Sequence, residues 1–321
     1  MAIRRLIDLP HYDTIIRVPH HEITLPVTGD YHLGQTLSLL TMGRGNPCLR
    51  HNETQGQLTL NTPRGPVALA ATRSGETLRV VVTGSAAEWI EPLLPGLFGL
   101  EDDLTGFAPE GRLGRIADEL AGLRLPRLPA VFDRLVQIVL QQLIQFRDAC
   151  RGWRLLVHRY GEEVPHSGGL YYAPTAETLA GLAVYQLMEC DILPKHARVI
   201  LTLAKQAAAL ERLWESGADP AARERLCEHL LRQPGVGPWT VGYLRGAGLG
   251  DADALVLGDY GHPHHVAYFF TGKERSDDDE MQQLLAPYAP HRYRVLSLLI
   301  LGTPPPPRRG PRRASQRDRF R

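Results

Sequence analysis

The stretch LLRQPGVGPWTV, at positions 230–241, decides the fold of this chain. The apolar pattern leading into it predicts an amphipathic helix over residues 222–232. Pro234 and Gly235 then predict a reversal of the chain, and Gly237 is expected to allow a sharp turn because it carries no Cβ. Pro238 suits the first position of a second helix, over residues 238–247, since the N–H that it lacks would have no intrahelical partner. The stretch therefore predicts two helices joined by a tight hairpin.

Such a hairpin exposes backbone N–H groups next to the N-terminus of a helix. These groups can hold one phosphate of DNA, and they do so without reading the base sequence. This kind of contact needs little side-chain charge. The alternative interpretation of the same residues is an ordinary helix–turn–helix connection inside an α-helical domain.

A second motif follows in residues 248–261, which are GLGDADALVLGDYG. Its apolar run ends in Gly258-Asp259, and Asp259 stands 22 residues after Gly237. Asp is a common N-cap residue, so Asp259 could begin a helix near Gly261. A carboxylate at this place could also take part in chemistry, and the two roles are compatible.

The hairpin and the spaced Gly-Asp pair resemble the helix-hairpin-helix DNA glycosylases, in particular their DNA-3-methyladenine glycosylase II (AlkA-like) branch. Members of that branch carry Pro-Gly-[Val/Ile]-Gly, then Trp-Thr, then an apolar stretch that ends in Gly-Asp. The likeness extends over residues 128–301 and includes VLQQ at 139–142 and LPKHAR at 193–198. It implies a base excision repair enzyme that flips alkylated bases out of damaged double-stranded DNA and excises them.

The resemblance assigns the catalytic role to Asp259. Breaking an N-glycosidic bond builds positive charge on the deoxyribose, and a carboxylate beside the anomeric carbon stabilises that charge. The carboxylate can also orient the attacking water. Trp239 and Tyr243 lie one helical turn apart and match aromatic residues of the base pocket, where electron-rich rings favour a cationic base by about 0.5–2 kcal/mol. The alternative for this pair is two aromatic residues of the core.

The remaining site residues are also implied by the resemblance. Tyr260 is a further pocket residue. Leu143, with Gln142 beside it, matches the wedge that fills the space left by the flipped base, and the alternative for Leu143 is a place in the core. The hairpin residues expected to contact DNA are Gln233, Pro234, Gly235, Val236, Gly237 and Thr240. Backbone carbonyls of Leu231, Gln233 and Val236 match a site for a monovalent cation, Na⁺ or K⁺, that occurs in the family.

Two features define the subtype that the resemblance implies. Trp239 stands where bifunctional relatives carry the lysine that forms a Schiff base, so a monofunctional enzyme without a lyase step is expected. The chain has no cysteine after Cys227, so no iron–sulfur cluster is expected, and no cofactor is required. Residues 298–301 are LLIL, where the branch often has aromatic residues. The base pocket is therefore expected to be more open, or selective for a different lesion.

Two other classes of function compete with this interpretation. His262, His264 and His265, next to Asp259, could bind a transition metal, which would make the protein a metal-dependent hydrolase. Pro263 interrupts any clean i, i+4 pair among these residues. The second alternative is a catalytically inactive DNA-binding or damage-sensing protein that keeps the same fold.

The rest of the chain predicts an α+β fold. Alternating apolar residues at 57–61, 67–70 and 78–82, separated by turn residues, predict an antiparallel meander that is similar to the family's TATA-binding-protein-like subdomain. Helices are expected over residues 86–94, 131–160, 175–188, 195–213, 280–285 and 292–301. These patterns predict three parts: a mixed β/α subdomain at 1–110, a mostly helical helix-hairpin-helix domain at 111–303, and a disordered basic tail at 304–321.

Composition limits the remaining possibilities. No apolar run approaches the length of a membrane span, and the N-terminus lacks a secretory signal. The four cysteines are far apart, which fits a reduced protein of the cytoplasm (nucleoid-associated in a bacterium), and we expect a monomer. The net charge is +1, but residues 308–321 carry seven Arg against one Asp, so the rest of the chain is acidic. Composition alone does not indicate a nucleic-acid-binding protein.

Overall fold

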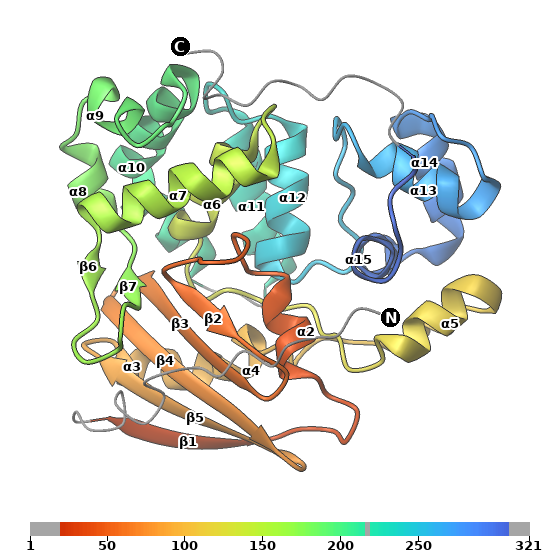
Figure 1. Ribbon diagram of the computed structural model, residues 1–321, viewed down its shortest axis with the longest axis horizontal. Helices are drawn as coiled ribbons and strands as arrows, with labels where there is room; N and C mark the ends of the chain where they lie inside the picture. The colour runs from red at the N-terminus through yellow and green to blue at the C-terminus, as the bar shows by residue number, and fades with distance from the viewer. Residues whose placement is uncertain (1–19, 216–218, 308–321) are drawn as a thin grey trace.

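The computed structural model describes residues 20–215 and 219–307. A five-stranded antiparallel sheet forms the N-terminal part, and helices form the rest (Figure 1), which confirms the predicted α+β fold. The basic stretch at 308–321 lies outside the described residues. None of the helices in the described ranges is both long and apolar enough to cross a bilayer.

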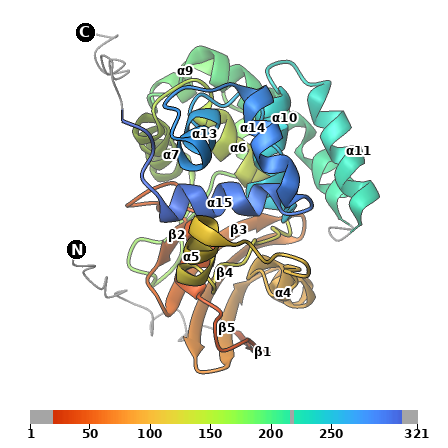
Figure 2. The same cartoon turned by 90° about the vertical axis from the view of Figure 1, so that its right-hand side faces the viewer.

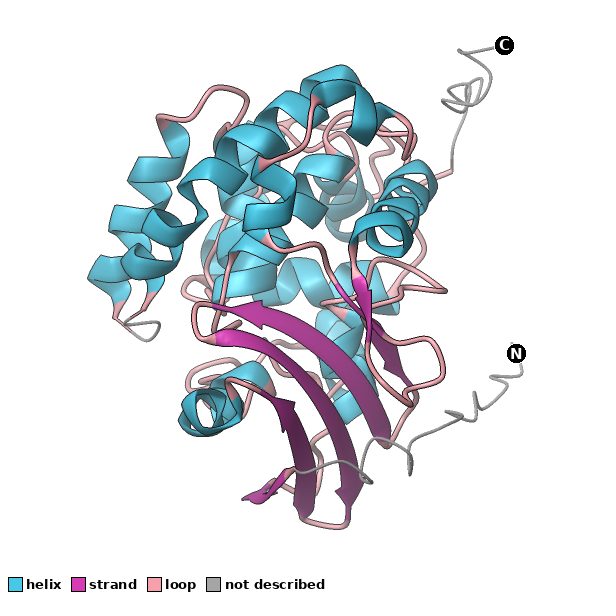
Figure 3. Ribbon diagram, turned by 90° about the vertical axis from the view of Figure 1, so that its left-hand side faces the viewer, coloured by secondary structure: helices cyan, strands magenta, loops and turns pink. Residues whose placement is uncertain are grey.

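The sheet contains the predicted meander. Its strands are β1 (His21–Pro26), β2 (Leu49–His51), β3 (Gln55–Thr62), β4 (Gly65–Ser74) and β5 (Thr77–Gly84), in the order β1-β5-β4-β3-β2. Leu58 pairs with Leu69, and Leu69 pairs with Val82, so these apolar side chains share one face of the sheet. Most of the helices lie above the sheet in the view of Figure 3, and further short helices lie beside and behind it.

Short helices cover the apolar face of the sheet. They are α2 (Leu33–Ser38), α3 (Ala87–Ile90), the 3-10 turn η1 (Glu91–Leu93) and α4 (Leu94–Leu97). The helix predicted over residues 86–94 is present, but it continues to Leu97 and is interrupted by the 3-10 turn, in which Pro92 cannot donate a backbone hydrogen bond. The hairpin of β6 (Glu162–Glu163) and β7 (Tyr171–Tyr172) packs on the other face.

The helical part runs from α5 to α15. Its elements are α5 (Gly111–Glu119), α6 (Phe132–Gln141), α7 (Phe146–Tyr160), α8 (Ala176–Ala180), α9 (Val184–Met188), α10 (Pro194–Trp214), α11 (Pro220–Leu231), α12 (Pro238–Leu249), α13 (His262–Thr271), α14 (Asp278–Leu285), η2 (Ala286–Tyr288) and α15 (Arg292–Gly302). Helix α5, the first of these elements, packs against α15 (Figure 2).

Two of the predicted helices are broken. The expected helix over residues 131–160 is two helices, because Leu143 between them has a φ of 57°. The apolar residues of this segment keep helical spacing through the break, so the sequence pattern does not indicate the turn. The expected helix over residues 175–188 is likewise split into α8 and α9 after Gly181. Thr175 does cap the first of these, since its side chain accepts a hydrogen bond from the backbone N–H of Thr178.

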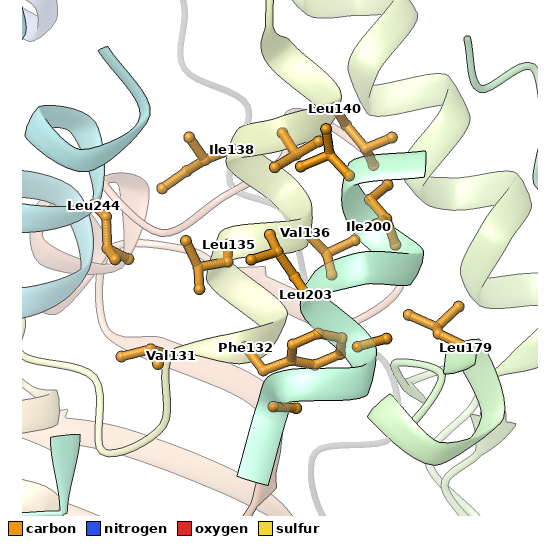
Figure 4. Close-up of a cluster of buried hydrophobic side chains, with 14 of the residues drawn as sticks. Val131, Phe132, Leu135, Val136, Ile138, Leu140, Leu179, Ile200, Leu203 and Leu244 are labelled. Carbon is orange, nitrogen blue, oxygen red and sulfur yellow. The ribbon is translucent and has the colours of Figure 1, made fainter. Parts of the chain in front are cut away.

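Two cores meet at helix α12. The central core surrounds α6, whose side chains pack against α10 and α12; Figure 4 shows Leu135 and Ile138 of α6 with Leu203 of α10 and Leu244 of α12. A second core joins α5, the loop after α12, α13, α14 and α15. Trp239 and Tyr243, both on α12, pack against both cores. The first turns of α12 are therefore held from two sides.

A buried carboxylate holds the N-terminus of α6. Glu211 of α10 accepts hydrogen bonds from the backbone N–H groups of Val131 (3.0 Å) and Phe132 (2.8 Å). Asp133, in the first turn of α6, accepts one from the backbone N–H of Asn61 on β3 (3.1 Å), which ties the helix to the sheet. Burial raises the pKa of Glu211 to about 8 and that of Asp133 to about 6, although these hydrogen bonds oppose the shifts.

The raised pKa of Glu211 predicts a stability that falls as the pH rises. Between the pKa of an unfolded glutamate, about 4.3, and the folded value, only the folded state holds the proton, so unfolding free energy is lost at about 1.4 kcal/mol per pH unit. Glu211→Gln should remove this contribution. The unfolding free energy of the variant, measured by urea denaturation, should therefore rise relative to that of the wild type between pH 5 and pH 8. Glu228→Gln, on the exposed face of α11, is the matched control and should run parallel to the wild type. A Glu211→Gln curve that also ran parallel would contradict the assignment.

Candidate DNA interface and active site

The predicted hairpin is present between α11 and α12. Gly235 has a φ of +82°, a conformation that favours glycine, and a Cβ added there would lie 2.3 Å from Cγ2 of Val199 on α10. Gly237, the N-cap residue of α12, is extended instead, with a φ of −116°, and a Cβ would meet nothing within 4 Å. The prediction that Gly237 makes the sharp turn is therefore wrong. Gly235 makes the turn, whereas Gly237 leaves open space in front of the helix.

The hairpin residues divide into exposed and inward-facing groups. Pro234 and Gly235 are exposed, and Gly237 is half-buried. Val236 is buried, and its N–H closes the turn onto the carbonyl of Gln233 at 3.1 Å. Thr240 is also buried, and its hydroxyl accepts a hydrogen bond from Gln142. The part of the hairpin that can meet a ligand is thus backbone, beside the first turn of α12, where N–H groups have no intrahelical partner.

Asp259 lies directly beside this helix. Its Oδ2 accepts a hydrogen bond from Nε1 of Trp239 at 2.8 Å. Its Oδ1 accepts hydrogen bonds from the backbone N–H groups of Gly261 (2.7 Å) and His262 (2.9 Å), at the start of α13. The capping role that the sequence allows is therefore present, and both carboxylate oxygens are fixed in position.

The surroundings of Asp259 favour its charged form. Burial alone would raise the pKa of this carboxyl group. The charge of His262 when it is protonated, the indole N–H of Trp239 and the two backbone N–H groups outweigh burial and lower the pKa below that of an ordinary aspartate. Because burial lowers the pKa of His262 as well, the hydrogen bonds are the contribution that persists when this imidazole is neutral. The Asp259 side chain keeps an exposed fraction of 18%. It is a fixed negative charge that a ligand can reach.

Aromatic rings surround this carboxylate. The rings of Trp239 and Tyr243 lie 5.4 Å apart, and the ring of His262 is nearly parallel to that of Tyr243 at 6.2 Å. Trp239 and Tyr243 are only half-buried, so they border both the cores and the surface at this point. Tyr260 lies at the surface with an exposed fraction of 79%, and its ring meets the edge of His264. The sequence did not indicate that His262 would join the aromatic pair.

The three histidines do not form a metal site. His262 faces Tyr243 and Asp259, whereas Nδ1 of His264 accepts a hydrogen bond from the backbone of Ser276 at 3.1 Å. Nε2 of His265 pairs with the hydroxyl of Thr303 at 2.8 Å. Within residues 20–215 and 219–307, no group of three His, Cys, Asp or Glu side chains could hold a metal ion. This arrangement contradicts the metal-dependent hydrolase.

The turn between α6 and α7, residues 142–145, carries the predicted wedge. Leu143 has an exposed fraction of 77%, which rules out the alternative that it belongs to the core. Gln142 beside it donates from Nε2 to the carbonyl of Gly235 (3.0 Å) and to the hydroxyl of Thr240 (2.9 Å). The structure therefore brings the wedge turn against the hairpin, although the two are 93 residues apart. No pattern in the sequence indicated this contact.

The two hairpin glycines should differ in their effect on stability. Gly235→Ala forces a side chain into a strained conformation and against Val199, so we expect a loss of about 1–3 kcal/mol in unfolding free energy. Gly237→Ala enters open space in an extended conformation and should stay within about 0.5 kcal/mol of the wild type. Urea denaturation of the two variants checks this difference. Equal losses would show that the turn is assigned to the wrong residue.

Sequence comparison relates the chain to alkylation-repair glycosylases. No family model matches it. Similar curated proteins include the DNA-3-methyladenine glycosylase of Bacillus subtilis, 24% identical over 200 residues, and DNA-3-methyladenine glycosylase 2 of Escherichia coli, 29% identical over 150 residues. The first match covers 60% of this chain and 64% of the relative, and the second covers 47% and 52%. The chain thus matches less than two thirds of the length of either relative.

Solved structures show the fold. A 3-methyladenine DNA glycosylase from Archaeoglobus fulgidus superposes with a TM-score of 0.73 at 21% identity, over 87% of this chain and 97% of that one. A Clostridium acetobutylicum 8-oxoguanine glycosylase/lyase, solved with double-stranded DNA, has a TM-score of 0.65 at 14% identity, over 88% and 96%. The chain therefore has the fold of these DNA glycosylases, and over about half of its length its sequence is similar to DNA-3-methyladenine glycosylases.

Proposed function

We propose that this protein is a monofunctional DNA glycosylase that excises alkylated bases of the 3-methyladenine type during base excision repair. The observation that carries the proposal is the ionised, rigidly held Asp259 carboxylate beside the hairpin. The relatives named DNA-3-methyladenine glycosylase support the substrate class. The same relatives favour an enzyme over a catalytically inactive binding protein.

Asp259 would act on the sugar. As the N-glycosidic bond breaks, the deoxyribose gains positive charge, and a fixed negative charge nearby stabilises the transition state more than the ground state. Because Trp239 and the N-terminus of α13 already hold both carboxylate oxygens, little reorganisation is needed at the moment of reaction. Asp259 can also orient or deprotonate the water that attacks the anomeric carbon.

The base would enter beside the aromatic rings. The target nucleotide must leave the duplex to reach Asp259, and the exposed Leu143 is placed to fill the vacated space. Trp239 and Tyr243 offer electron-rich faces to a cationic alkylated base, which is a good leaving group without strong acid assistance. Tyr260 is a further candidate at the rim of this pocket.

We include in this proposal that the enzyme removes the base but does not cleave the DNA backbone by a lyase step. The fold is shared with a protein described as a glycosylase/lyase, so the fold does not decide the subtype. By the resemblance, Trp239 stands where the bifunctional relatives carry the Schiff-base lysine, and an indole cannot form a Schiff base; its N–H donates to Asp259.

The remaining expectations stay predictions. A monovalent cation would be held by the carbonyls of Leu231, Gln233 and Val236; the Gln233 carbonyl accepts the N–H of Val236 and has a second lone pair for a cation. No other cofactor is required by the chemistry. We also propose that the protein acts as a monomer in the cytoplasm, which its four free cysteines fit.

The hairpin proposal predicts a loss of affinity without a loss of fold. Gly237→Val places a branched side chain in the open space where a phosphate would approach. Affinity for duplex DNA should fall by about tenfold, the equivalent of one hydrogen bond to a charged group. The loss should be the same for unrelated sequences, since phosphate contacts carry no sequence information. Fluorescence anisotropy measures it, and unchanged affinity in a folded variant would rule out the hairpin as the phosphate site.

The catalytic proposal predicts a loss of turnover with retained binding. Asp259→Asn keeps the shape and, through its single amide oxygen, the bonds from Gly261 and His262. It removes the charge and also the bond from Trp239, because the amide NH2 cannot accept a hydrogen bond. Excision should therefore fall by at least about 10²–10³-fold, the loss expected for one well-placed electrostatic group. DNA affinity should not fall and should rise slightly, because the variant loses a negative charge that repels the phosphates. Single-turnover release of 3-methyladenine and 7-methylguanine from duplexes measures the effect.

The control for this variant needs an aspartate without a structural role. Asp251 and Asp253, in the same loop, are unsuitable because they pair with Arg245 (2.7 Å) and Arg292 (2.6 Å). Asp279 on α14 is exposed, and Asp279→Asn should keep the wild-type rate. Normal excision by Asp259→Asn would contradict the mechanism, and collapse of its fold would support a purely structural role.

A further inference from the structure

The side chain of Gln142 joins two surface elements that are far apart in the sequence. Its amide nitrogen donates hydrogen bonds to Gly235, in the hairpin, and to Thr240, in the first turn of α12. Gln142 itself is the residue that ends α6, directly before Leu143. A single amide group therefore spans the gap between the wedge turn and the hairpin.

The wedge turn needs this support. Leu143 has a φ of 57°, a conformation that L-residues with side chains rarely adopt unless their surroundings impose it. On one side of Leu143, Gln142 is bonded to the hairpin; on the other, Ile144 packs against the central core. These two anchors hold the backbone so that the Leu143 side chain projects from the surface between them.

The hairpin end of the bridge is itself rigid. Gly235 fits against Val199 of α10 only because it lacks a side chain. Thr240 follows Trp239, whose indole holds the Asp259 carboxylate. The bridge therefore connects the wedge turn to the same helical turn that positions the carboxylate and whose N-cap is Gly237.

We propose that Gln142 is a positioning residue that couples the hairpin's contact with a DNA phosphate to the insertion of Leu143 into the duplex. This inference rests on the proposed function of the site. Gln142 does not fill the space left by the flipped base, because both hydrogens of its amide are engaged inside the protein. It fixes the distance between the bound phosphate and the wedge, so that docking of the hairpin places Leu143 at one nucleotide.

Gln142→Met tests the coupling, since methionine has a similar length but cannot donate. The substrates are a duplex with a paired alkylated base and the same duplex with an abasic site opposite that base. In the second duplex the alkylated base has no pairing partner, so flipping it out costs less free energy. A poorly positioned Leu143 should therefore slow excision less on that duplex. We expect excision to fall by about tenfold or more on the paired lesion and by less than about threefold on the other, with unchanged affinity for undamaged DNA. Equal losses on both duplexes would overturn the proposal, and so would a wild-type rate on the paired lesion.

Gln141→Met is the matched control. The Gln141 amide donates to the carbonyl of Gln137 within its own helix and to the sulfur of Met42, so it supports α6 but not the bridge. The same chemical change one residue earlier should leave the ratio of the two excision rates at the wild-type value. In a Leu143→Ala background, Gln142→Met should lower the excision rate on the paired lesion little further, because Gln142 is proposed to act only by positioning the Leu143 side chain. Additive losses would contradict this.

A second measurement separates this inference from the proposed activity. A 2-aminopurine beside the target nucleotide brightens when the duplex is unstacked, whether or not a bond is broken. The wild type should raise this fluorescence on binding, and Gln142→Met should lose most of the rise at saturating protein. A wild type that unstacks DNA but releases no base would refute the glycosylase and leave the coupling intact. A variant with a full fluorescence rise would refute the coupling alone.

Discussion

The hydrogen bond between Trp239 and Asp259 is the interaction on which the site depends. It joins the first turn of α12 to the loop before α13, and it turns a loop carboxylate into a fixed charge. The bond can do so because α12 is packed between two cores, so that its first turns cannot shift toward either one. The position of the chemistry is thus set by hydrophobic packing on both sides of one helix.

Four consecutive residues at the start of α12 carry three tasks. Gly237 leaves the approach to the backbone open, Trp239 holds the carboxylate, and Thr240 receives the bridge from Gln142. Pro238 is the first residue of the helix, where the N–H that it lacks would have no intrahelical partner. Because these residues share one helical turn, a shift of that turn would move the proposed phosphate contact, the proposed wedge and the carboxylate together.

The elements with strong local signals could be predicted from the sequence. Pro238 and Pro194 mark helix starts, and alternation marks the meander, so these parts agree with the structure. The break at Leu143 could not be predicted, because the apolar spacing of a helix continues through it. The reversal at Gly235 was predicted correctly, but the sharp turn assigned to Gly237 was not. Only the neighbouring Val199, from a distant helix, shows that Gly235 is the glycine that must lack a side chain. Contacts made across the fold, such as those of Gln142 and His262, leave no mark in local patterns.

The open space in front of Gly237 has a consequence for how such surfaces are found. An interface built from backbone amides and a missing side chain adds no formal charge to the surface, only the partial charges of the helix N-terminus, and an alanine scan of charged residues would not test it. It also displaces few counterions, so binding by this part of the protein should depend only weakly on ionic strength. Searches for nucleic-acid-binding surfaces that rely on positive charge would miss proteins of this kind, whereas a scan of exposed glycines at helix starts would detect them.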